Sequence, residues 1–415
     1  MFNEKPIISK WVADIYDQKE TETDDVDFLL SVIGDQPQKI LEVCCGSGRI
    51  LVPLAKVGHT VVGIDADTFM LDKIQAKAVG LDNIEWHKAD AVHDDWGSGF
   101  DVVVLAGNIL YNIVSDMDYA KAQELFIKKA ASALVPGGYV FISYSPGGKN
   151  LIKREPSHEN NNERVVWEGT DNDGNFGKMI SLGSSYDSET QLDKFVRRFE
   201  LTLASGEQIR QDIDCVKHAV MLDQLRDWLY DAGFIIGLQC EDYEKNPIND
   251  NSCEVKIYAR KKPEKPINIE YREIDSSVLY DIACAFDNGS AKHIVLHENA
   301  FALAALDENI PVGFISVTPR AMGYPLEHIK DAYIEIYEVH DFYQRQGIGR
   351  YMVQCAEDWA REKGVRQIRT HHSDNAVAAI HMSYSLGYGM CPHEYHKDEG
   401  CAGYYVAKVL APNEK

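Results

Sequence analysis

The sequence predicts an α/β protein with two domains, and three observations support this fold class. A short apolar strand ends in a Gly-x-Gly turn within 41–48 and leads into a helical pattern. Apolar runs alternate with amphipathic segments over 38–145, which indicates a parallel sheet with helices on both faces. In the second half, an alternating strand at 332–337 precedes another glycine-bearing loop and a helix that runs to Lys363.

A charged, proline-rich segment separates the two halves. Residues 261–266 read Lys-Lys-Pro-Glu-Lys-Pro and have no apolar period, which is typical of a linker. The 415 residues are enough for two domains that each bury a core. We therefore expect a first domain over 1–262, a linker over 263–266 and a second domain over 267–415.

Composition and charge disfavour several classes of function. The net charge of −23 argues against a nucleic-acid partner, because nucleic-acid binding needs a basic face. The same charge is compatible with a cationic small substrate, or it only keeps the protein soluble. The nine cysteines follow no framework of spacings and are expected to be free thiols. No secretory signal and no apolar run of membrane-spanning length is visible, so we expect a cytoplasmic protein without a membrane partner.

The other elements of the first half follow in order along the chain. The patterns predict two helices within 1–35, a strand at 100–106, a helix at 121–134 that ends at Pro136-Gly137-Gly138, a strand at 139–144, a mobile polar loop at 147–163, alternating strands over 164–216 and a helix at 222–233.

The first glycine-bearing loop is suited to a nucleotide-like cofactor. Glycine at 46 and 48 permits a tight turn and lets a ligand lie against the backbone, while the next helix presents its N–H groups. Leu51 stands where a dinucleotide fingerprint has its third glycine, which disfavours NAD or FAD. Asp65 and Asp90 end the next two strands, and an acid after the second strand can accept hydrogen bonds from both ribose hydroxyls.

These features together resemble a known family. The segment Leu41–Leu71, LEVCCGSGRILVPLAKVGHTVVGIDADTFML, is similar to the small-molecule branch of the class I S-adenosylmethionine (SAM)-dependent methyltransferases. The resemblance covers about the first 260 residues. It implies a Rossmann-like doubly wound sheet, an antiparallel insertion at about 147–217 over the acceptor pocket, and SAM as cofactor. By position, the implied SAM-binding residues are Tyr16, Glu42, Gly46, Gly48, Asp65, Ala66, Ala89, Asp90 and Ala106.

Acceptor contacts are expected where the strand at 100–106 ends. The carboxyl ends of strands in an open α/β sheet face the ligand crevice, so Asn108 and Tyr111 would face the methyl group or the acceptor. Asn108 is equally well explained as a plain turn residue. Arg198 and His218 are weaker candidates, because such residues are more often structural. Methyl transfer from a sulfonium depends mainly on alignment, and the sequence shows no unmistakable general base.

The second glycine-bearing loop, Gln344–Arg350, is suited to a pyrophosphate. Its successive backbone N–H groups at a helix start form an anion nest, and no Lys-Ser/Thr pair follows as it would in a Walker loop. This loop resembles motif A of the GNAT N-acetyltransferases, and the segments 302–317 and Asn375–Tyr388 resemble that family's paired central strands and closing element. The resemblance covers about 267–410. It implies a mixed, mainly antiparallel sheet and acetyl-coenzyme A (acetyl-CoA) as cofactor.

Acetyl transfer to an amine requires loss of a proton from nitrogen, an oxyanion donor and an easily leaving thiolate. Glu335 and Glu338 alternate along one strand, so only one would face the cleft, and Glu338 is the candidate base. The Val339 N–H is the candidate oxyanion donor. The family's closing tyrosine, which protonates the thiolate, maps to Tyr384. The implied acetyl-CoA-binding residues are Val339, Gln344, Arg345, Gln346, Gly347, Ile348, Gly349, Arg350, Asn375 and Tyr384.

No metal site is expected. Cys391, His393, His396 and Cys401 have spacings that fit no common structural zinc site, and His371-His372 are expected to follow a strand as ordinary residues.

The sequence therefore predicts a bifunctional transferase. One module would methylate a small-molecule amine or hydroxyl acceptor from SAM, and the other would acetylate an amine from acetyl-CoA. Fusion favours a single metabolic, natural-product or antibiotic-modifying pathway. Two alternatives stay open, namely a modifier of protein amines, and a chain in which one module is catalytically silent and serves as a cofactor sensor or scaffold. The acceptor, the methylated atom and the oligomeric state are not determined by the sequence.

Overall fold

The computed structural model describes residues 5–34, 36–147, 163–249, 252–264, 268–286, 289–322, 324–394 and 402–410. Backbone contacts divide the chain into two compact units, Met1–Glu264 and Lys265–Lys415, and each is described by itself. Most of the predicted loop at 147–163, residues 265 and 266 of the predicted linker, and the residues His396 and Cys401 lie outside the described residues.

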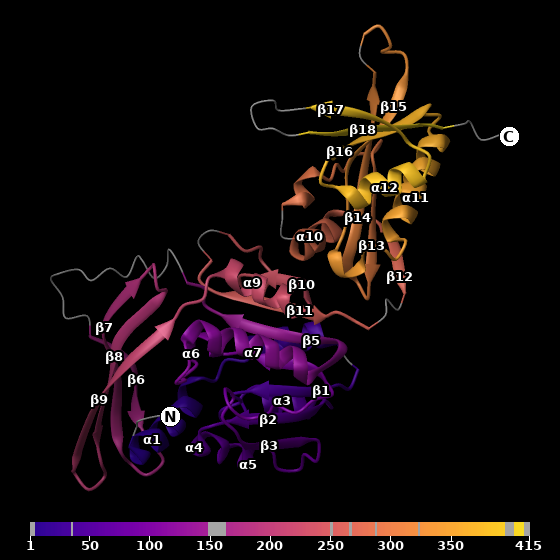
Figure 1. The fold of residues 1–415 in the computed structure, drawn as a ribbon. Helices are drawn as coiled ribbons and strands as arrows, with labels where there is room; N and C mark the ends of the chain where they lie inside the picture. The colour runs from indigo at the N-terminus through magenta and orange to yellow at the C-terminus, as the bar shows by residue number, and fades with distance from the viewer. Residues whose placement is uncertain are drawn as a thin grey trace. The chain divides into compact units, whose positions relative to one another are not determined.

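The first unit is built on a seven-stranded sheet with the order β10-β11-β5-β4-β1-β2-β3 (Figure 1). β1 to β5 run parallel, and β11 is antiparallel to β5. β10 is antiparallel to β11 and therefore runs in the same direction as β1 to β5. After β1 the chain adds β2 and β3 on one side of β1 and then returns to place β4 on its other side. The boundary between β1 and β4 is therefore the topological switch point, where ligands bind in such sheets. The strands are β1 Lys39–Val43, β2 Thr60–Asp65, β3 Ile84–Lys88, β4 Phe100–Leu105, β5 Leu134–Tyr144, β10 Phe234–Cys240 and β11 Val255–Lys261.

Helices cover both faces of this sheet. Alternate residues of β4 enter two hydrophobic clusters, because successive side chains of a strand point to opposite faces. Val103 and Leu105 pack with α7 and α9, while Val102 and Val104 pack with α2 and α3. The doubly wound α/β fold predicted from the apolar periodicity is thereby confirmed. The helices are α1 Pro6–Lys19, α2 Asp24–Ile33, α3 Leu51–Lys56, α4 Thr68–Leu71, α5 Ile74–Lys77, α6 Ile109–Asn112, α7 Tyr119–Ala133 and α9 Leu222–Asp231.

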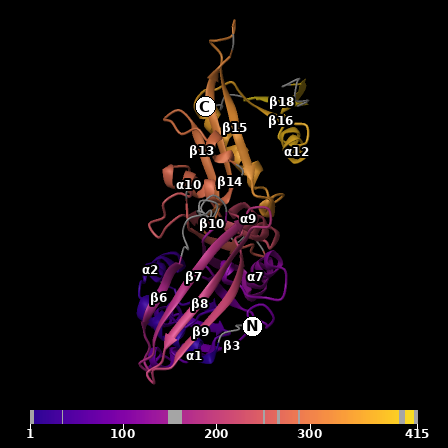
Figure 2. The same cartoon turned by 90° about the vertical axis from the view of Figure 1, so that its left-hand side faces the viewer.

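A second, four-stranded antiparallel sheet belongs to the same unit, and Figure 2 shows its strands side by side. Helix α1 packs on this sheet through Ile8, Trp11 and Ile15, and the Trp11 indole Nε1 donates to the Gly169 carbonyl at 3.2 Å. The N-terminal helix is therefore anchored to the sheet far along the sequence. The strands are β6 Glu163–Thr170, β7 Phe176–Asp187, β8 Leu192–Thr202 and β9 Gln208–His218.

The second unit has a mixed seven-stranded sheet with the order β12-β13-β14-β15-β16-β18-β17. β15 and β16 are its parallel pair within the described residues, and they pair only over 331–333 and 367–369 before they diverge. The strands are β12 Ile269–Glu273, β13 Phe301–Asp307, β14 Ile310–Ala321, β15 Lys330–Val339, β16 Gln367–Ser373, β17 Gly389–Glu394 and β18 Ala402–Val409. The helical segments are α10 Ser276–Ala285, η1 Ser290–His293, η2 Asp341–Tyr343, α11 Ile348–Glu362 and α12 Val377–Ser385.

Two local predictions were wrong. Strand β5 begins at Leu134, so Pro136-Gly137-Gly138 lies inside the strand and not between helix and strand. The pairing of β5 with β4 shifts register there, which is how a strand accommodates residues that break regular pairing. His371 and His372 lie within β16 and do not follow it. In the part of the chain that the structure describes, no helix is long and apolar enough to cross a membrane.

Candidate cofactor and acceptor sites

The first candidate site is the loop between β1 and α3. Gly46 and Gly48 have φ of +54° and +77°, which a residue with a Cβ rarely adopts. The Gly46 N–H donates to Asp65 Oδ2 at 2.9 Å, and the Asp67 N–H donates to Asp65 Oδ1 at 2.8 Å. Each carboxylate oxygen keeps a further lone pair, so Asp65 is fixed in place and still able to accept hydroxyl groups. The structure thus joins the loop glycines to the acid that ends β2.

Glu42 lies in β1 immediately before this loop. Its carboxyl is buried, and its Oε2 has no hydrogen-bond partner among the described residues. Burial raises the pKa of Glu42 to about 8, while the nearby Arg49 guanidinium opposes the rise. A buried acid with an unsatisfied oxygen is a suitable partner for a ligand cation, because ionisation then gains a counter-charge.

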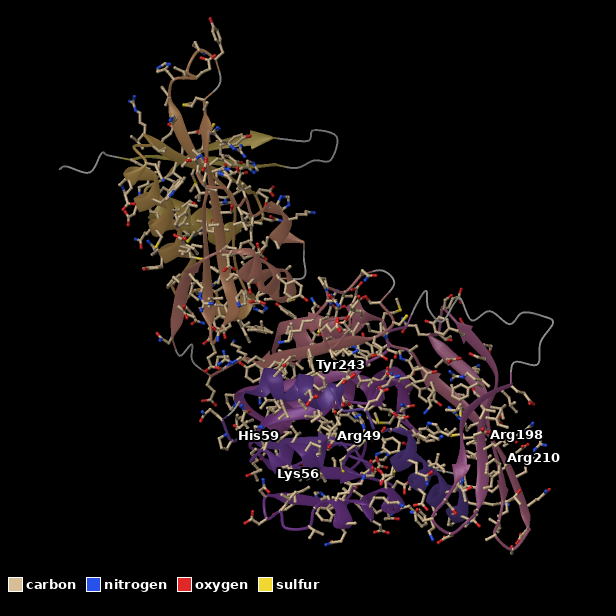
Figure 3. The ribbon with its side chains drawn as sticks, turned by 180° about the vertical axis from the view of Figure 1, so that it is seen from behind. Arg49, Lys56, His59, Arg198, Arg210 and Tyr243 are labelled. Atoms are coloured by element: carbon tan, nitrogen blue, oxygen red, sulfur yellow. The ribbon has the colours of Figure 1, made fainter. Side chains whose placement is uncertain are left out.

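Arg49 connects the loop to the N-terminal helices and is labelled in Figure 3. Its guanidinium pairs with the Asp25 carboxylate, and its Nε lies 3.4 Å from the Tyr16 hydroxyl. Tyr16 in turn packs edge-on against Trp167 of β6, with ring centroids 5.9 Å apart. The predicted cofactor residue Tyr16 therefore lies between the loop and the four-stranded sheet.

A lysine that sequence reasoning missed also holds the loop. Lys77 Nζ donates to the Ser47 carbonyl at 2.9 Å and to Asp17 Oδ1 at 2.8 Å. Ser47 is fully buried and donates its hydroxyl to the same Asp17 carboxylate. These three residues are 30 to 60 positions apart in the sequence. No local pattern indicates such a contact.

The other predicted cofactor residues lie at the carboxyl ends of β2, β3 and β4. Ala89 is buried and donates its N–H to the Asp65 carbonyl at 2.9 Å, which links two of these ends. The Asp90 carboxylate accepts from the Val92 N–H at 2.9 Å and closes a turn, while the residue as a whole is exposed. Ala66 is exposed and Ala106 is half-buried.

Asn108 and Tyr111 lie after β4, at the switch point. Asn108 adopts φ of +59°, and its Oδ1 accepts from the Ser145 N–H at 3.0 Å, so it holds the ends of β4 and β5 together. The Tyr111 hydroxyl donates to the buried Asp193 at 2.6 Å, and the Ser184 hydroxyl donates to the other oxygen of Asp193 at 2.8 Å. Tyr111 therefore ties α6 to strands β7 and β8.

The two weaker acceptor candidates have structural partners. The Arg198 guanidinium makes two 2.8 Å hydrogen bonds with Asp212 on the neighbouring strand. Figure 3 shows Arg198 and Arg210 on the four-stranded sheet, away from Arg49. His218 is buried, with Nδ1 2.6 Å from Gln123 Oε1, and burial lowers its pKa. Neither arrangement calls for a ligand.

The second candidate site is a cleft of about 990 Å³ in the second unit. Glu338 and Val339 from the end of β15 line it, opposite residues Asn375–Ala379 at the start of α12. Most of the predicted cofactor residues also line it, and these are Gln344, Arg345, Gly347, Ile348, Gly349 and Arg350. Gln346 is exposed and donates from Nε2 to the Phe342 carbonyl at 3.3 Å.

The loop of this cleft begins α11, a helix of 15 residues. Gly347 has φ of +88° and Arg345 has φ of +62°, so the backbone N–H groups turn toward one side as in an anion nest. The Tyr343 hydroxyl donates to buried Asp307 Oδ2 at 2.6 Å and anchors the segment before the loop. The loop and the helix N-terminus can bind a phosphate group through backbone N–H groups.

Tyr384, the predicted acid, is 75% exposed on α12. It is not among the described residues that line the cleft. A smaller cavity of about 250 Å³ opens between the diverging strands β15 and β16, and Glu335, Tyr337, His371 and His372 are among its lining residues. Glu335 and Glu338 thus line different cavities. No group of three or more metal-ligating side chains occurs within the described residues.

The chain has two α/β units, and each has a glycine-bearing loop between a strand and a helix. Residues 40–138 match the family model described as methyltransferase domain, and residues 266–388 match the acetyltransferase (GNAT) family. The chain therefore carries a methyltransferase domain followed by a GNAT acetyltransferase domain, as the sequence motifs predict.

Relatives match mainly the first domain. A candidate methyltransferase of Geobacillus sp. (strain WCH70) is 25% identical over 227 residues, which are 54% of this chain and 85% of the relative. A ubiquinone biosynthesis O-methyltransferase of Brucella anthropi is 32% identical over 108 residues, but the match spans only 40% of its length. Among solved structures, the CcbJ methyltransferase from Streptomyces caelestis aligns with 60% of this chain and 96% of its own, at 20% identity and a TM-score of 0.47.

Proposed function

We propose that the first unit binds SAM at the β1–α3 loop and methylates a small-molecule amine or hydroxyl. The observation that carries this proposal is the buried, unsatisfied Glu42 Oε2 beside a glycine loop at the β1/β4 switch point. SAM carries an ammonium group and a ribose diol, and it supplies a methyl group on a sulfonium. In this proposal Glu42 accepts from the ammonium group, Asp65 accepts from the ribose hydroxyls, and Asp90 accepts from the adenine amino group.

Tyr111 is the residue that we propose to position the acceptor. It lies in α6, after β4, and its hydrogen bond to buried Asp193 fixes its ring relative to the four-stranded sheet. Asn108 keeps a structural role in this proposal, because its side chain already joins β4 to β5. Arg198 and His218 are omitted from the proposed site because each has a structural partner.

We also propose that the second unit binds acetyl-CoA in the 990 Å³ cleft and acetylates an amine. Acetyl-CoA supplies an acyl group on a thioester. The loop from Gln344 to Arg350 would bind its pyrophosphate through backbone N–H groups. The Val339 N–H would donate to the carbonyl oxygen, and Glu338 would receive the proton that the amine loses.

The acceptor class rests on charge. A net charge of −23 opposes a polyanionic partner and is compatible with small amines, and the fusion favours one pathway for both activities. A small-molecule natural-product or antibiotic intermediate with an amine is therefore the proposed acceptor class. Acetylation of intact proteins but not of small amines would favour the alternative of a protein modifier.

Calorimetric titration of the full chain with SAM and with acetyl-CoA tests the proposal. We expect one site for each cofactor. Gly48→Val should abolish SAM binding because a Cβ at 48 would lie 3.1 Å from Ile74 at a positive φ, and it should leave acetyl-CoA binding unchanged. Gly347→Val should have the reverse effect. If neither cofactor binds the parent protein, the proposal is refuted. If only one cofactor binds, the module whose cofactor does not bind is the catalytically silent one. An amine screen with both cofactors then identifies acceptors.

A further inference from the structure

The wedge between β15 and β16 brings three polar side chains from three elements together. The strands are paired up to Tyr333 and Arg369, and beyond these residues they diverge. Tyr337 of β15 and His372 of β16 face each other across the wedge, with ring centroids 5.8 Å apart in an edge-to-face arrangement. Ser383 of α12 closes the wedge, because its hydroxyl lies 2.8 Å from His372 Nε2.

Tyr337 links the two cavities of this unit. Three residues line both the 990 Å³ cleft and the 250 Å³ cavity, namely Tyr337, Ala376 and Ala379. Tyr337 alone of these three has a polar side chain. Its hydroxyl oxygen is buried and makes no hydrogen bond of standard geometry with any described residue, although the Ser383 hydroxyl lies near it. A buried hydroxyl that lacks a hydrogen bond of standard geometry at the edge of a cleft can still donate its proton to a ligand.

Ser383 and His372 fix the position of this hydroxyl. Burial raises the pKa of Tyr337, and the nearby Ser383 hydroxyl opposes the rise. Burial and the adjacent His371 lower the pKa of His372 to about 4, so its ring is neutral at physiological pH. Ser383 and His372 are 5% exposed each, which restricts both to one arrangement. The Tyr337 proton therefore stays on oxygen and can be donated only as a hydrogen bond.

We propose that Tyr337, positioned by Ser383 and His372, donates a hydrogen bond to the thioester sulfur of acetyl-CoA and so stabilises the leaving thiolate, in place of the acid that the resemblance implies at Tyr384. This inference rests on the proposed use of acetyl-CoA by the second unit. As the acceptor nitrogen forms its bond to the carbonyl carbon, the carbon–sulfur bond breaks and its electron pair moves to sulfur. The proton that nitrogen loses is the one that sulfur finally gains, and Tyr337 keeps its own.

The ionisation of bound coenzyme A tests the role of Tyr337 without an acceptor. Coenzyme A is mixed with an excess of the full chain, its thiol is alkylated with iodoacetamide across a pH series, and alkylated coenzyme A is quantified by mass spectrometry. A hydrogen bond to the thiolate lowers the thiol pKa, so Tyr337→Phe should raise the pKa of the bound thiol by about one pH unit. Ser383→Ala should raise it less, and Ser383→Thr, which keeps the hydroxyl, should restore it.

Tyr384→Phe is the rival variant, and Tyr351→Phe, on the exposed face of α11, is the control. A shift with Tyr337→Phe and none with Tyr384→Phe supports the inference. A shift with Tyr384→Phe alone, or with neither variant, overturns it while the proposed acetyl-CoA binding stands. If coenzyme A does not bind the parent chain, the proposed function and the inference both fail. Should Tyr337→Phe fail to fold, the Ser383→Ala and Ser383→Thr pair decides between these outcomes.

Discussion

Replacing Glu42 by glutamine should change how SAM binding depends on pH. The carboxyl is buried at the start of the candidate SAM loop, and its pKa of about 8 means that it is protonated at pH 6.5 in the free protein. The α-amino group of SAM is an ammonium at that pH, since such groups have pKa values of about 7.7–8.0. Binding of the ammonium should ionise Glu42 and release its proton to the buffer.

The size of the effect follows from the pKa. At pH 6.5, ionising a group with a pKa of about 8 costs roughly 2 kcal/mol, which the ammonium must offset. Release of roughly one proton makes SAM binding about tenfold tighter per pH unit between about pH 5.5 and 7. Glutamine cannot ionise, so Glu42→Gln should bind SAM more weakly and with no pH dependence from this group.

Calorimetric titration in buffers with different ionisation enthalpies measures the protons released. We expect roughly one proton per SAM at pH 6.5 for the parent protein and roughly none for Glu42→Gln. The same number of protons in both proteins would refute the assignment of Glu42 to the ammonium. The stability of the free protein as a function of pH provides a second test. Because the folded pKa lies above the unfolded value of 4.5, stability should fall as pH rises from about 4.5 to about 8, and Glu42→Gln should remove that fall.

Three further predictions concern the scaffold. Gly177→Ala would place a Cβ 2.5 Å from the Trp11 ring, so it should loosen α1 from the four-stranded sheet, measured as faster amide exchange in α1; unchanged exchange would contradict the packing. Tyr343→Phe removes a hydrogen bond to buried Asp307, so it should lower the free energy of unfolding of the second unit by about 1–3 kcal/mol, as measured by urea unfolding. It should also weaken acetyl-CoA binding, while SAM binding, the control, should not change. Arg198→Ala breaks the ion pair with Asp212 on the four-stranded sheet, and calorimetry should show unchanged affinity for both SAM and acetyl-CoA. A loss of SAM binding would mean that Arg198 belongs to the candidate site of the first unit.

The fold was predictable because its signals are local. Apolar runs such as 100–105 become strands buried on both faces, and the two glycine loops stand where a strand gives way to a helix. The prediction that Pro136-Gly137-Gly138 lies between a helix and a strand was wrong, because a register shift within a sheet depends on the partner strand. The local sequence does not encode that partner.

The two candidate sites were only partly predictable, because some of their contacts join residues that are far apart in the sequence. The structure brings Gly46 together with Asp65, and Glu338 with the loop after β15, as the motifs indicate. It also adds Lys77 and Asp193, which act across 30 and 82 residues of chain. Contacts over such separations arise from tertiary packing, and a single sequence carries no periodic signal for them. Whether these residues bind the proposed cofactors and acceptors stays a prediction.

Tyr384 lies outside the large cleft, which the sequence alone does not indicate. The residues of the closing segment that line the large cleft are 375–379, His381 and Met382. Tyr384 lies two positions beyond Met382 and is 75% exposed. Ser383, one residue earlier, instead turns inward to His372. Tyr337 of the neighbouring strand does line the cleft, and it is the tyrosine that we propose to contact the thioester sulfur.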